Sequence, residues 1–145
     1  YVKPNIPKVK TVINKTLEWF KTRGISKDTL DDLMKWLENT PEGVGHNFKF
    51  YQSNHEGNII DYIHNNRDWM DGMIINAGAL THYSYAIRDA IEAIAVDTIE
   101  IHISDIKNRE EFRKKSVLED VCLSQIYGLG KYSYIEGLKI LINKE

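Results

Sequence analysis

The chain has 145 residues, of which 42% are hydrophobic and 28% charged, and this size and composition predict one globular domain over residues 1–145. Its 19 basic and 21 acidic residues leave a net charge of −2, which argues against bulk attraction to nucleic acid or to an anionic membrane. Cys122 is the only cysteine, so an internal disulfide and a cysteine-based zinc site are excluded and a cytoplasmic location is favoured. No apolar stretch approaches the ~18 residues of a membrane span.

The first segment has a mixed pattern. The chain begins at Tyr1 rather than at a methionine, and we expect further sequence before it. Residues 8–22 carry apolar side chains at helical spacing between Pro7 and Gly24, and we expect this segment to be more helical than extended. A first strand is then either cut to residues 1–2 or hidden in residues 9–14.

Strand and helix patterns alternate through the rest of the chain. Leu30, Leu33 and Leu37 lie on one face of a predicted helix, with Ser26 as a candidate N-cap. Four short segments rich in β-branched and apolar residues are predicted strands: 48–52, 69–76, 98–104 and 121–127. Helical patterns around 59–63, 86–94 and 135–142 separate and follow these strands. The alternation predicts a parallel sheet with helices on both faces.

The strand over 98–104 is unusual for a buried strand. It alternates isoleucine with Glu100, His102 and Ser104, whereas a buried parallel strand is expected to be apolar throughout. Burying a carboxylate beside an imidazole is costly unless the two pair or serve a site. Glu100 would raise the pKa of His102 and make it a general acid near neutral pH. The alternative is a structural Glu–His pair facing a loop.

Other polar segments follow predicted strands, where ligands bind in open α/β sheets. Asn76 precedes a glycine-containing loop and a helix, which indicates either an anion site or an ordinary loop capped by Thr81. Residues 53–56 fit a structural capping box. Arg109 and Arg113 share one helical side, and either could reach over the crevice. The sequence has no P-loop, dinucleotide turn or metal-ligand spacing, and Cys122 is interpreted as a packing residue.

Four motifs in this order strongly resemble the type II 3-dehydroquinate dehydratases. They are Phe50-Tyr51-Gln52-Ser53-Asn54-His55-Glu56-Gly57, Ile74-Ile75-Asn76-Ala77-Gly78-Ala79 with Thr81-His82, Ile99-Glu100-Ile101-His102-Ile103-Ser104, and Arg109-Glu110-Glu111-Phe112-Arg113 with Ser116. The resemblance covers residue 29 to the C-terminus. It implies a flavodoxin-like fold with three layers, a dodecamer built from trimers, and no cofactor. It also implies conversion of 3-dehydroquinate to 3-dehydroshikimate by loss of water through an enolate.

The resemblance also implies a role for each matching residue. His102 would protonate the leaving hydroxyl and Glu100 would orient His102, while Asn76 would stabilise the charge of the enolate. The backbone amides of Ile103 and Ser104 would bind the substrate carboxylate. The residues implied to bind ring hydroxyls are His82 and Arg113, with Asp89 reaching in from a neighbouring subunit.

The N-terminal 28 residues depart from the family pattern. Family members carry a first strand, a Gly-Pro-Asn-Leu-type turn and a lid with an arginine and the tyrosine that abstracts the substrate proton. Either Pro4-Asn5-Ile6 is the remnant of the turn, which would make Asn5 a site residue, or Ile13-Asn14 marks it and Arg23 is the lid arginine. No tyrosine lies between Tyr1 and Tyr51. The alternative to an enzyme is therefore a non-catalytic relative that binds the same ligands.

Overall fold

The structure is a computed structural model that describes residues 9–14 and 29–144. Its strands are β1 Val9–Asn14, β2 Asn47–Gln52, β3 Gly72–Asn76, β4 Thr98–Ile101 and β5 Ser124–Ile126; its α-helices are α2 Leu30–Asn39, α3 Glu56–Asn66, α4 Tyr85–Ile94 and α5 Tyr132–Asn143; and its short 3-10 helices are η1 Gly78–His82, η2 Ile106–Asn108, η3 Glu111–Lys114 and η4 Glu119–Val121. None of the helices in the described ranges has the length and apolar character that a membrane crossing requires.

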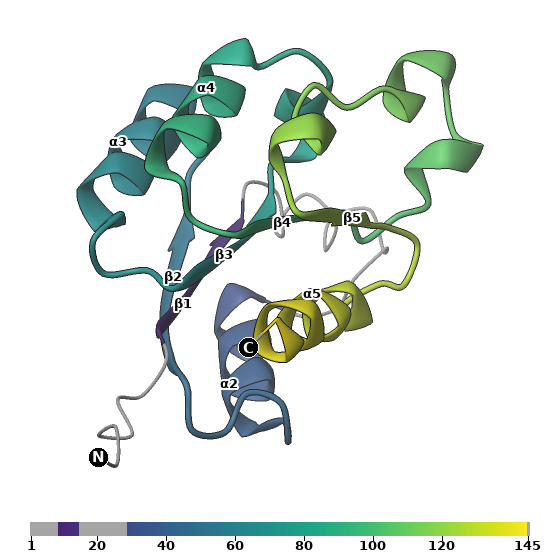
Figure 1. The fold of residues 1–145 in the computed structure, drawn as a ribbon. Helices are drawn as coiled ribbons and strands as arrows, with labels where there is room; N and C mark the ends of the chain where they lie inside the picture. Colours follow the sequence, from purple (N-terminus) through teal and green to yellow (C-terminus); the bar gives the residue numbers. More distant parts are fainter. Residues whose placement is uncertain (1–8, 15–28, 145) are drawn as a thin grey trace.

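The five strands form one parallel sheet in the order β2-β1-β3-β4-β5. Helices α2 and α5 cover one face of the sheet, and α3 and α4 cover the other (Figure 1). This is the strand order of the flavodoxin-like doubly wound fold, in which the order reverses beside β1 and ligands bind beyond the carboxyl ends of the strands. The predicted parallel sheet with helices on both faces is confirmed.

The expectation that residues 8–22 are mainly helical is wrong for Val9–Asn14, which form β1. This strand lies between β2 and β3, with Asn14 in register with both Gln52 and Asn76. A strand inside a parallel sheet is covered on both faces, so its sequence need not alternate and can imitate a helical face. The prediction of a strand hidden in residues 9–14 is thus confirmed, and residues 15–28 lie outside the described residues.

The core is divided between the two faces of the sheet by the alternation of strand residues. Ile74 and Ile99 pack against α2 and α5, whereas Met73 and Ile75 pack against α3 and α4. Glu100 follows Ile99 and is paired in register with Ile75, so its side chain enters the α3/α4 side of the core. A carboxylate placed there requires polar partners within the protein.

Strand β4 ends at Ile101, three residues earlier than expected, because the following chain bonds to a loop rather than to a strand. After β5, Gly128 (φ 80°) and Gly130 (φ 58°) adopt left-handed conformations that favour glycine. Their amides donate to the carbonyls of Ser104 and Ile103 at 3.1 and 3.0 Å. The β4 extension is thereby held without continuing the ladder of strand hydrogen bonds.

Two helix starts differ from the sequence predictions. Helix α2 is capped by Thr29 rather than Ser26: the Thr29 hydroxyl accepts from the Asp32 amide at 3.2 Å, and the Asp32 carboxylate accepts from the Thr29 amide at 2.9 Å. This capping box starts the helix three residues later than Ser26 would. The box expected over residues 53–56 is also wrong, since Ser53 accepts from the amide of His55 at 3.0 Å and does not cap α3.

Candidate active site

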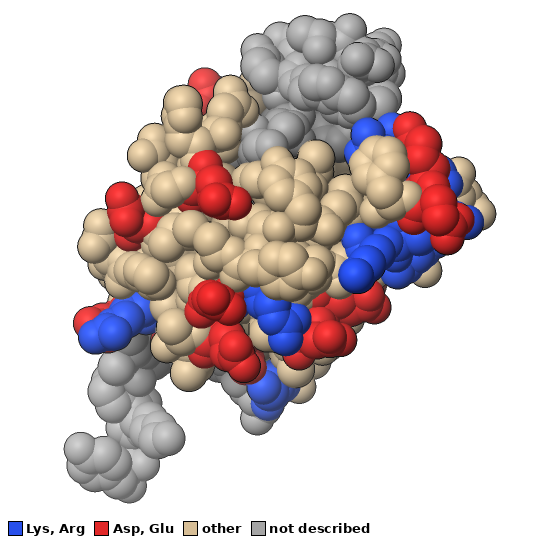
Figure 2. All heavy atoms as spheres, turned by 90° about the horizontal axis from the view of Figure 1, so that it is seen from above, with Lys and Arg blue, Asp and Glu red and all other residues tan. Residues whose placement is uncertain are grey.

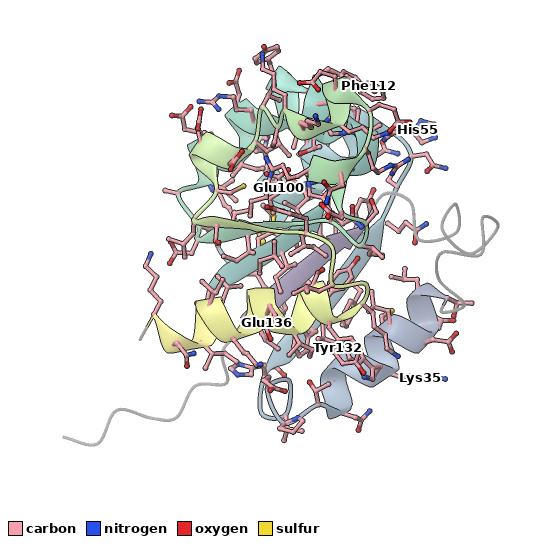
Figure 3. The ribbon with its side chains drawn as sticks, turned by 90° about the vertical axis from the view of Figure 1, so that its right-hand side faces the viewer. Lys35, His55, Glu100, Phe112, Tyr132 and Glu136 are labelled. Atoms are coloured by element: carbon pink, nitrogen blue, oxygen red, sulfur yellow. The ribbon has the colours of Figure 1, made fainter. Side chains whose placement is uncertain are left out.

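A buried carboxylate lies at the centre of a polar cluster at the carboxyl ends of β3 and β4. Glu100 is 0% exposed and lies on the side of the sheet opposite Glu136 and Tyr132 of α5 (Figure 3). The cluster is assembled from β4, from η1 after β3, from the segment before η4, and from β5. These segments are far apart in the sequence. They meet at one carboxylate because the carboxyl ends of parallel strands lie at the same edge of the sheet.

Four side chains of the described residues hydrogen-bond to the Glu100 carboxylate. His102 Nε2 lies 2.7 Å from Oε1, and the Thr81 hydroxyl donates to the same oxygen. Ser116 Oγ lies 2.9 Å from both carboxylate oxygens, and Gln125 Nε2 lies 3.1 Å from Oε2. Burial opposes ionisation of Glu100, but hydrogen bonds from His102, Thr81 and Ser116 outweigh it and hold the pKa of this carboxyl below its ordinary value. Glu100 is therefore an anion in a nearly dry setting.

The pairing with Glu100 fixes the orientation of His102, which is 4% exposed. An ionised carboxylate only accepts, so His102 Nε2 carries a hydrogen and donates. Ring nitrogen Nδ1 makes no hydrogen bond to any described residue. The His102 imidazole thus has one nitrogen held by an anion and one free to act on a bound molecule.

Asn76 ends β3 and presents an unpaired donor. Its Oδ1 accepts from the amide of Gly78 at 3.2 Å, which fixes the side chain at the start of η1. Its Nδ2 is buried and has no partner among the described residues, and the residue is 1% exposed. A buried amide group without a partner is costly, so this donor indicates a site for an oxygen atom of a ligand.

The segment after β4 offers two adjacent backbone donors. The amides of Ile103 and Ser104 donate to no oxygen in the described part of the chain, although their carbonyls are bonded. Arg109 Nη1 lies 3.4 Å from the Ser104 hydroxyl and brings a positive charge close to these amides. Two adjacent amides beside a guanidinium favour an anion such as a carboxylate.

His82 and Arg113 meet over Phe112. His82 Nδ1 lies 2.6 Å from the carbonyl of Lys115, so Nδ1 donates and Nε2 is left to accept. The Phe112 ring lies edge-on to His82, at 5.7 Å between centroids, and the Arg113 guanidinium lies 4.8 Å from the Phe112 centroid. Burial of His82, with His102 and Arg113 nearby, holds the pKa of its imidazole below the ordinary value. His82 is thereby kept neutral, so its Nε2 can accept a hydrogen bond.

The structure does not bring every predicted residue to this cluster. Asp89 is exposed on α4, and its predicted contact with a neighbouring subunit stays a prediction. Asn5 and Arg23 lie outside the described residues. Cys122 packs beside the α3/α4 side of the core as expected. Among the described residues no group of three or more His, Cys, Asp or Glu side chains is arranged to hold a metal ion.

Three partners of Glu100 were missed as site residues by sequence reasoning. Thr81 was considered only as a helix cap, but Ser84 caps α4 by accepting from the Ile87 amide at 3.0 Å. Ser116 and Gln125 were given no role. The signal for Gln125 was available, because it is a polar residue in an apolar strand and is in register with Glu100.

The chain is similar to proteins of one family. The family model "Dehydroquinase class II" matches residues 20–142. A 3-dehydroquinate dehydratase of Thermotoga neapolitana is 53% identical over 111 residues, 77% of this chain and 75% of that protein. A 3-dehydroquinate dehydratase of Bacillus cereus is 49% identical over 118 residues, 81% of each chain.

Solved structures give the same result. A type II dehydroquinase from Butyrivibrio crossotus superposes with a TM-score of 0.87 at 39% identity and covers 93% of this chain and 97% of that one. A type II dehydroquinase from Propionibacterium acnes superposes with a TM-score of 0.83 at 32% identity, with 94% and 98% covered.

Proposed function

The chain belongs to the class II dehydroquinases, and we propose that its site catalyses the reaction for which its relatives are named, the dehydration of 3-dehydroquinate to 3-dehydroshikimate. As a 3-dehydroquinate dehydratase it is a carbon–oxygen lyase that acts on a small molecule. The observation that carries the assignment of the site is the Glu100–His102 pair, which is buried, joined at 2.7 Å, and leaves one imidazole nitrogen free.

His102 acts as the general acid in this proposal. A proton leaves the carbon next to the ketone, the enolate expels the hydroxyl, and His102 Nδ1 gives that hydroxyl the proton with which it departs as water. Ionised Glu100 stabilises the imidazolium before transfer and keeps Nε2 occupied. The free Nδ1 is the atom that meets the leaving group.

The remaining groups bind the substrate and its developing charge. Asn76 Nδ2 provides a fixed donor, directly or through a water molecule, where the enolate oxygen forms, which is the preorganised stabilisation that elimination requires. The amides of Ile103 and Ser104 bind the substrate carboxylate. His82 and Arg113 bind ring hydroxyls, which suits a neutral imidazole and a guanidinium held by Glu110 at 3.0 Å.

The proton-abstracting base is assigned to the N-terminal segment. The family's lid tyrosine has no counterpart between Tyr1 and Tyr51, so a lysine or arginine from residues 8–23 takes the proton in our proposal, with Asn5 or Arg23 as the turn or lid residue.

Turnover can be measured by the rise in absorbance of 3-dehydroshikimate. We expect activity in the wild type and a loss of ~10²–10⁴-fold in kcat for His102→Ala, the usual contribution of an acid or base. Glu136→Gln on α5, on the opposite face of the sheet, is the control and should keep wild-type turnover. No turnover above background at high wild-type concentration would overturn the proposal.

Calorimetric titration with a planar enolate mimic that bears a carboxylate tests the binding roles. Because Ile103 and Ser104 hold the carboxylate through the backbone, His102→Ala should weaken binding only modestly. Arg113→Ala should weaken it more, since a charge-assisted hydrogen bond contributes ~1.5–3 kcal/mol. Tight binding of the mimic without wild-type turnover would favour the non-catalytic alternative, which no comparison supports.

The proposal extends to the assembly. Asp89 is exposed on α4 and would complete the site of an adjacent subunit. The assembly would be a dodecamer built from trimers, and each chain would be a single domain. We place this assembly in the cytoplasm, where a lone unpaired cysteine is stable. The site itself requires no cofactor in this proposal.

A further inference from the structure

We propose that Gln125 is a positioning residue of this site: its amide holds Oε2 of Glu100, so that Oε1 stays directed at His102. This inference rests on the proposed function and adds to it a residue outside the matching motifs. The geometry that carries it is the register of the sheet. Gln125 of β5 is paired with Glu100 of β4, so the two side chains leave the same face of the sheet as neighbours.

The contact has only one arrangement while Glu100 is ionised. A carboxylate only accepts hydrogen bonds, so the Gln125 amide must present Nε2 to it, at 3.1 Å from Oε2. This leaves Gln125 Oε1 buried without a partner in the described residues. The side-chain amide of Gln125 thus leaves its own oxygen unsatisfied in order to donate one hydrogen bond to Glu100. A buried oxygen without a partner is costly, which argues against a purely structural role.

The donors divide between the two oxygens of the carboxylate. His102 and Thr81 both bond Oε1, Gln125 bonds Oε2, and the Ser116 hydroxyl lies 2.9 Å from each oxygen. Gln125 is the donor that faces Oε2 alone. Without it, the carboxylate is free to rotate its charge away from His102.

Ser116 cannot replace Gln125. The Ser116 hydroxyl accepts from the amides of Leu118 and Glu119 at 3.0 and 3.1 Å, so it is fixed from the backbone side. Its single hydrogen serves one oxygen at a time. The orientation of the carboxylate therefore depends on the amide from β5.

In the part of the chain that the structure describes, three titratable groups face Glu100 from the elements around it. They are His102 after β4, His82 at the end of η1 and the Cys122 thiol after η4. Removing the Gln125 donor raises the pKa of Glu100 because the anion loses a hydrogen bond. The acid limb of the pH profile then moves to higher pH.

The test uses Gln125→Met, which keeps the length of the side chain and removes the donor. We expect kcat to fall about tenfold with KM nearly unchanged, and the acid limb of the kcat profile to shift upward by about half a pH unit or more. Gln125→Glu places a second carboxylate against Glu100 and should shift the profile further, because two adjacent carboxylates do not ionise together easily. Ser124→Ala, the neighbouring β5 residue whose side chain faces α5, is the matched control and should match the wild type.

A second measurement does not depend on turnover. In protein labelled with ¹⁵N-histidine, the ring resonances of His102, assigned by their loss in His102→Ala, should shift in Gln125→Met, because the carboxylate that accepts from Nε2 is no longer held. They should stay in place in Ser124→Ala. If the acid limb of the kcat profile and the His102 resonances keep their wild-type positions in Gln125→Met, Gln125 only packs and the inference is wrong. If the wild type shows no turnover, the proposed function fails, and the His102 resonances alone then decide whether Gln125 positions the pair.

Discussion

Burying an ionised glutamate ties the stability of this protein to pH. The pKa of Glu100 is below its ordinary value of 4.5 in the folded chain, so the folded state gives up this proton more readily than the unfolded state. Its contribution is complete above the ordinary value and is lost as the pH falls through the lower, native pKa. The unfolding free energy should therefore decrease as the pH falls below the ordinary value of 4.5.

Urea unfolding of Glu100→Gln tests this dependence. The amide cannot ionise, so the variant should lose less stability than the wild type over the same acid range. Asp31→Asn, an exposed carboxyl in the first turn of α2, is the control and should keep the wild-type slope. Equal acid slopes in Glu100→Gln and wild type would show that folding does not lower the pKa of Glu100.

At Cys122, unlike at Glu100, the effect of burial on the pKa is not outweighed by hydrogen bonds. Burial and the nearby negative charge of Glu100 raise the pKa of its thiol to about 12, and only the thiolate reacts quickly. We expect no labelling by an aromatic disulfide reagent in the native chain at about pH 8, and complete labelling of the one cysteine after denaturation. Rapid labelling of the native protein would contradict the raised pKa of this half-buried thiol.

At the scale of elements, one hydroxyl joins two helices. Ser84 caps α4 through the Ile87 amide at 3.0 Å and donates to Glu56 Oε2 of α3 at 2.6 Å. Ser84→Ala should lower the free energy of unfolding by about 1–2 kcal/mol, because it removes an N-cap and leaves a carboxylate without its donor. Ser84→Thr keeps the hydroxyl and should retain most of the stability in the same urea measurement. Equal losses in both variants would assign the effect to packing.

The same scale explains which elements could be predicted from the sequence. Helices α3 and α4 carry an apolar stripe beside a polar face, and this pattern is sufficient to locate them. Strand β1 has no such contrast, since it is covered on both faces and its spacing also fits a helix. The segment at 69–71 was assigned to β3, but Trp69 and Met70 donate back to Asn66 and continue the end of α3.

The site was predictable where polar residues alternate with apolar ones on a strand that is expected to be buried. Glu100 and His102 stand out because polar residues on a buried strand need a reason. Ser116 does not stand out, because it reaches Glu100 only through the loop before η4. Gln125 stands out only as a polar residue in a predicted strand, and its pairing with Glu100 is set by the sheet. Contacts set by tertiary structure leave no local pattern in the sequence.

At the scale of the whole molecule, the surface carries charges of both signs. Figure 2 shows Lys and Arg side chains among Asp and Glu, rather than one field of a single sign. Such a surface does not repel its own copies strongly at moderate salt. It is compatible with the proposed assembly, and the prediction is a mass of twelve chains of 16.8 kDa each.

Static light scattering at micromolar protein concentration measures that mass directly. We expect a dodecamer, or trimers under conditions that separate them, with activity lost once trimers dissociate, because Asp89 would then leave the neighbouring site. Asp89→Ala should lower activity while keeping the mass. A monomer with full activity would contradict the assembly.

The early end of β4 has a consequence for hydrogen exchange. The amides of Ile103 and Ser104 lie next to a sheet but take no part in its ladder, so they should exchange with deuterium much faster than the amides of β3 and β4. A bound carboxylate would slow the exchange of these two amides specifically. Mass spectrometry of the peptide that contains them would thus report occupancy of the site even in variants that have lost all turnover.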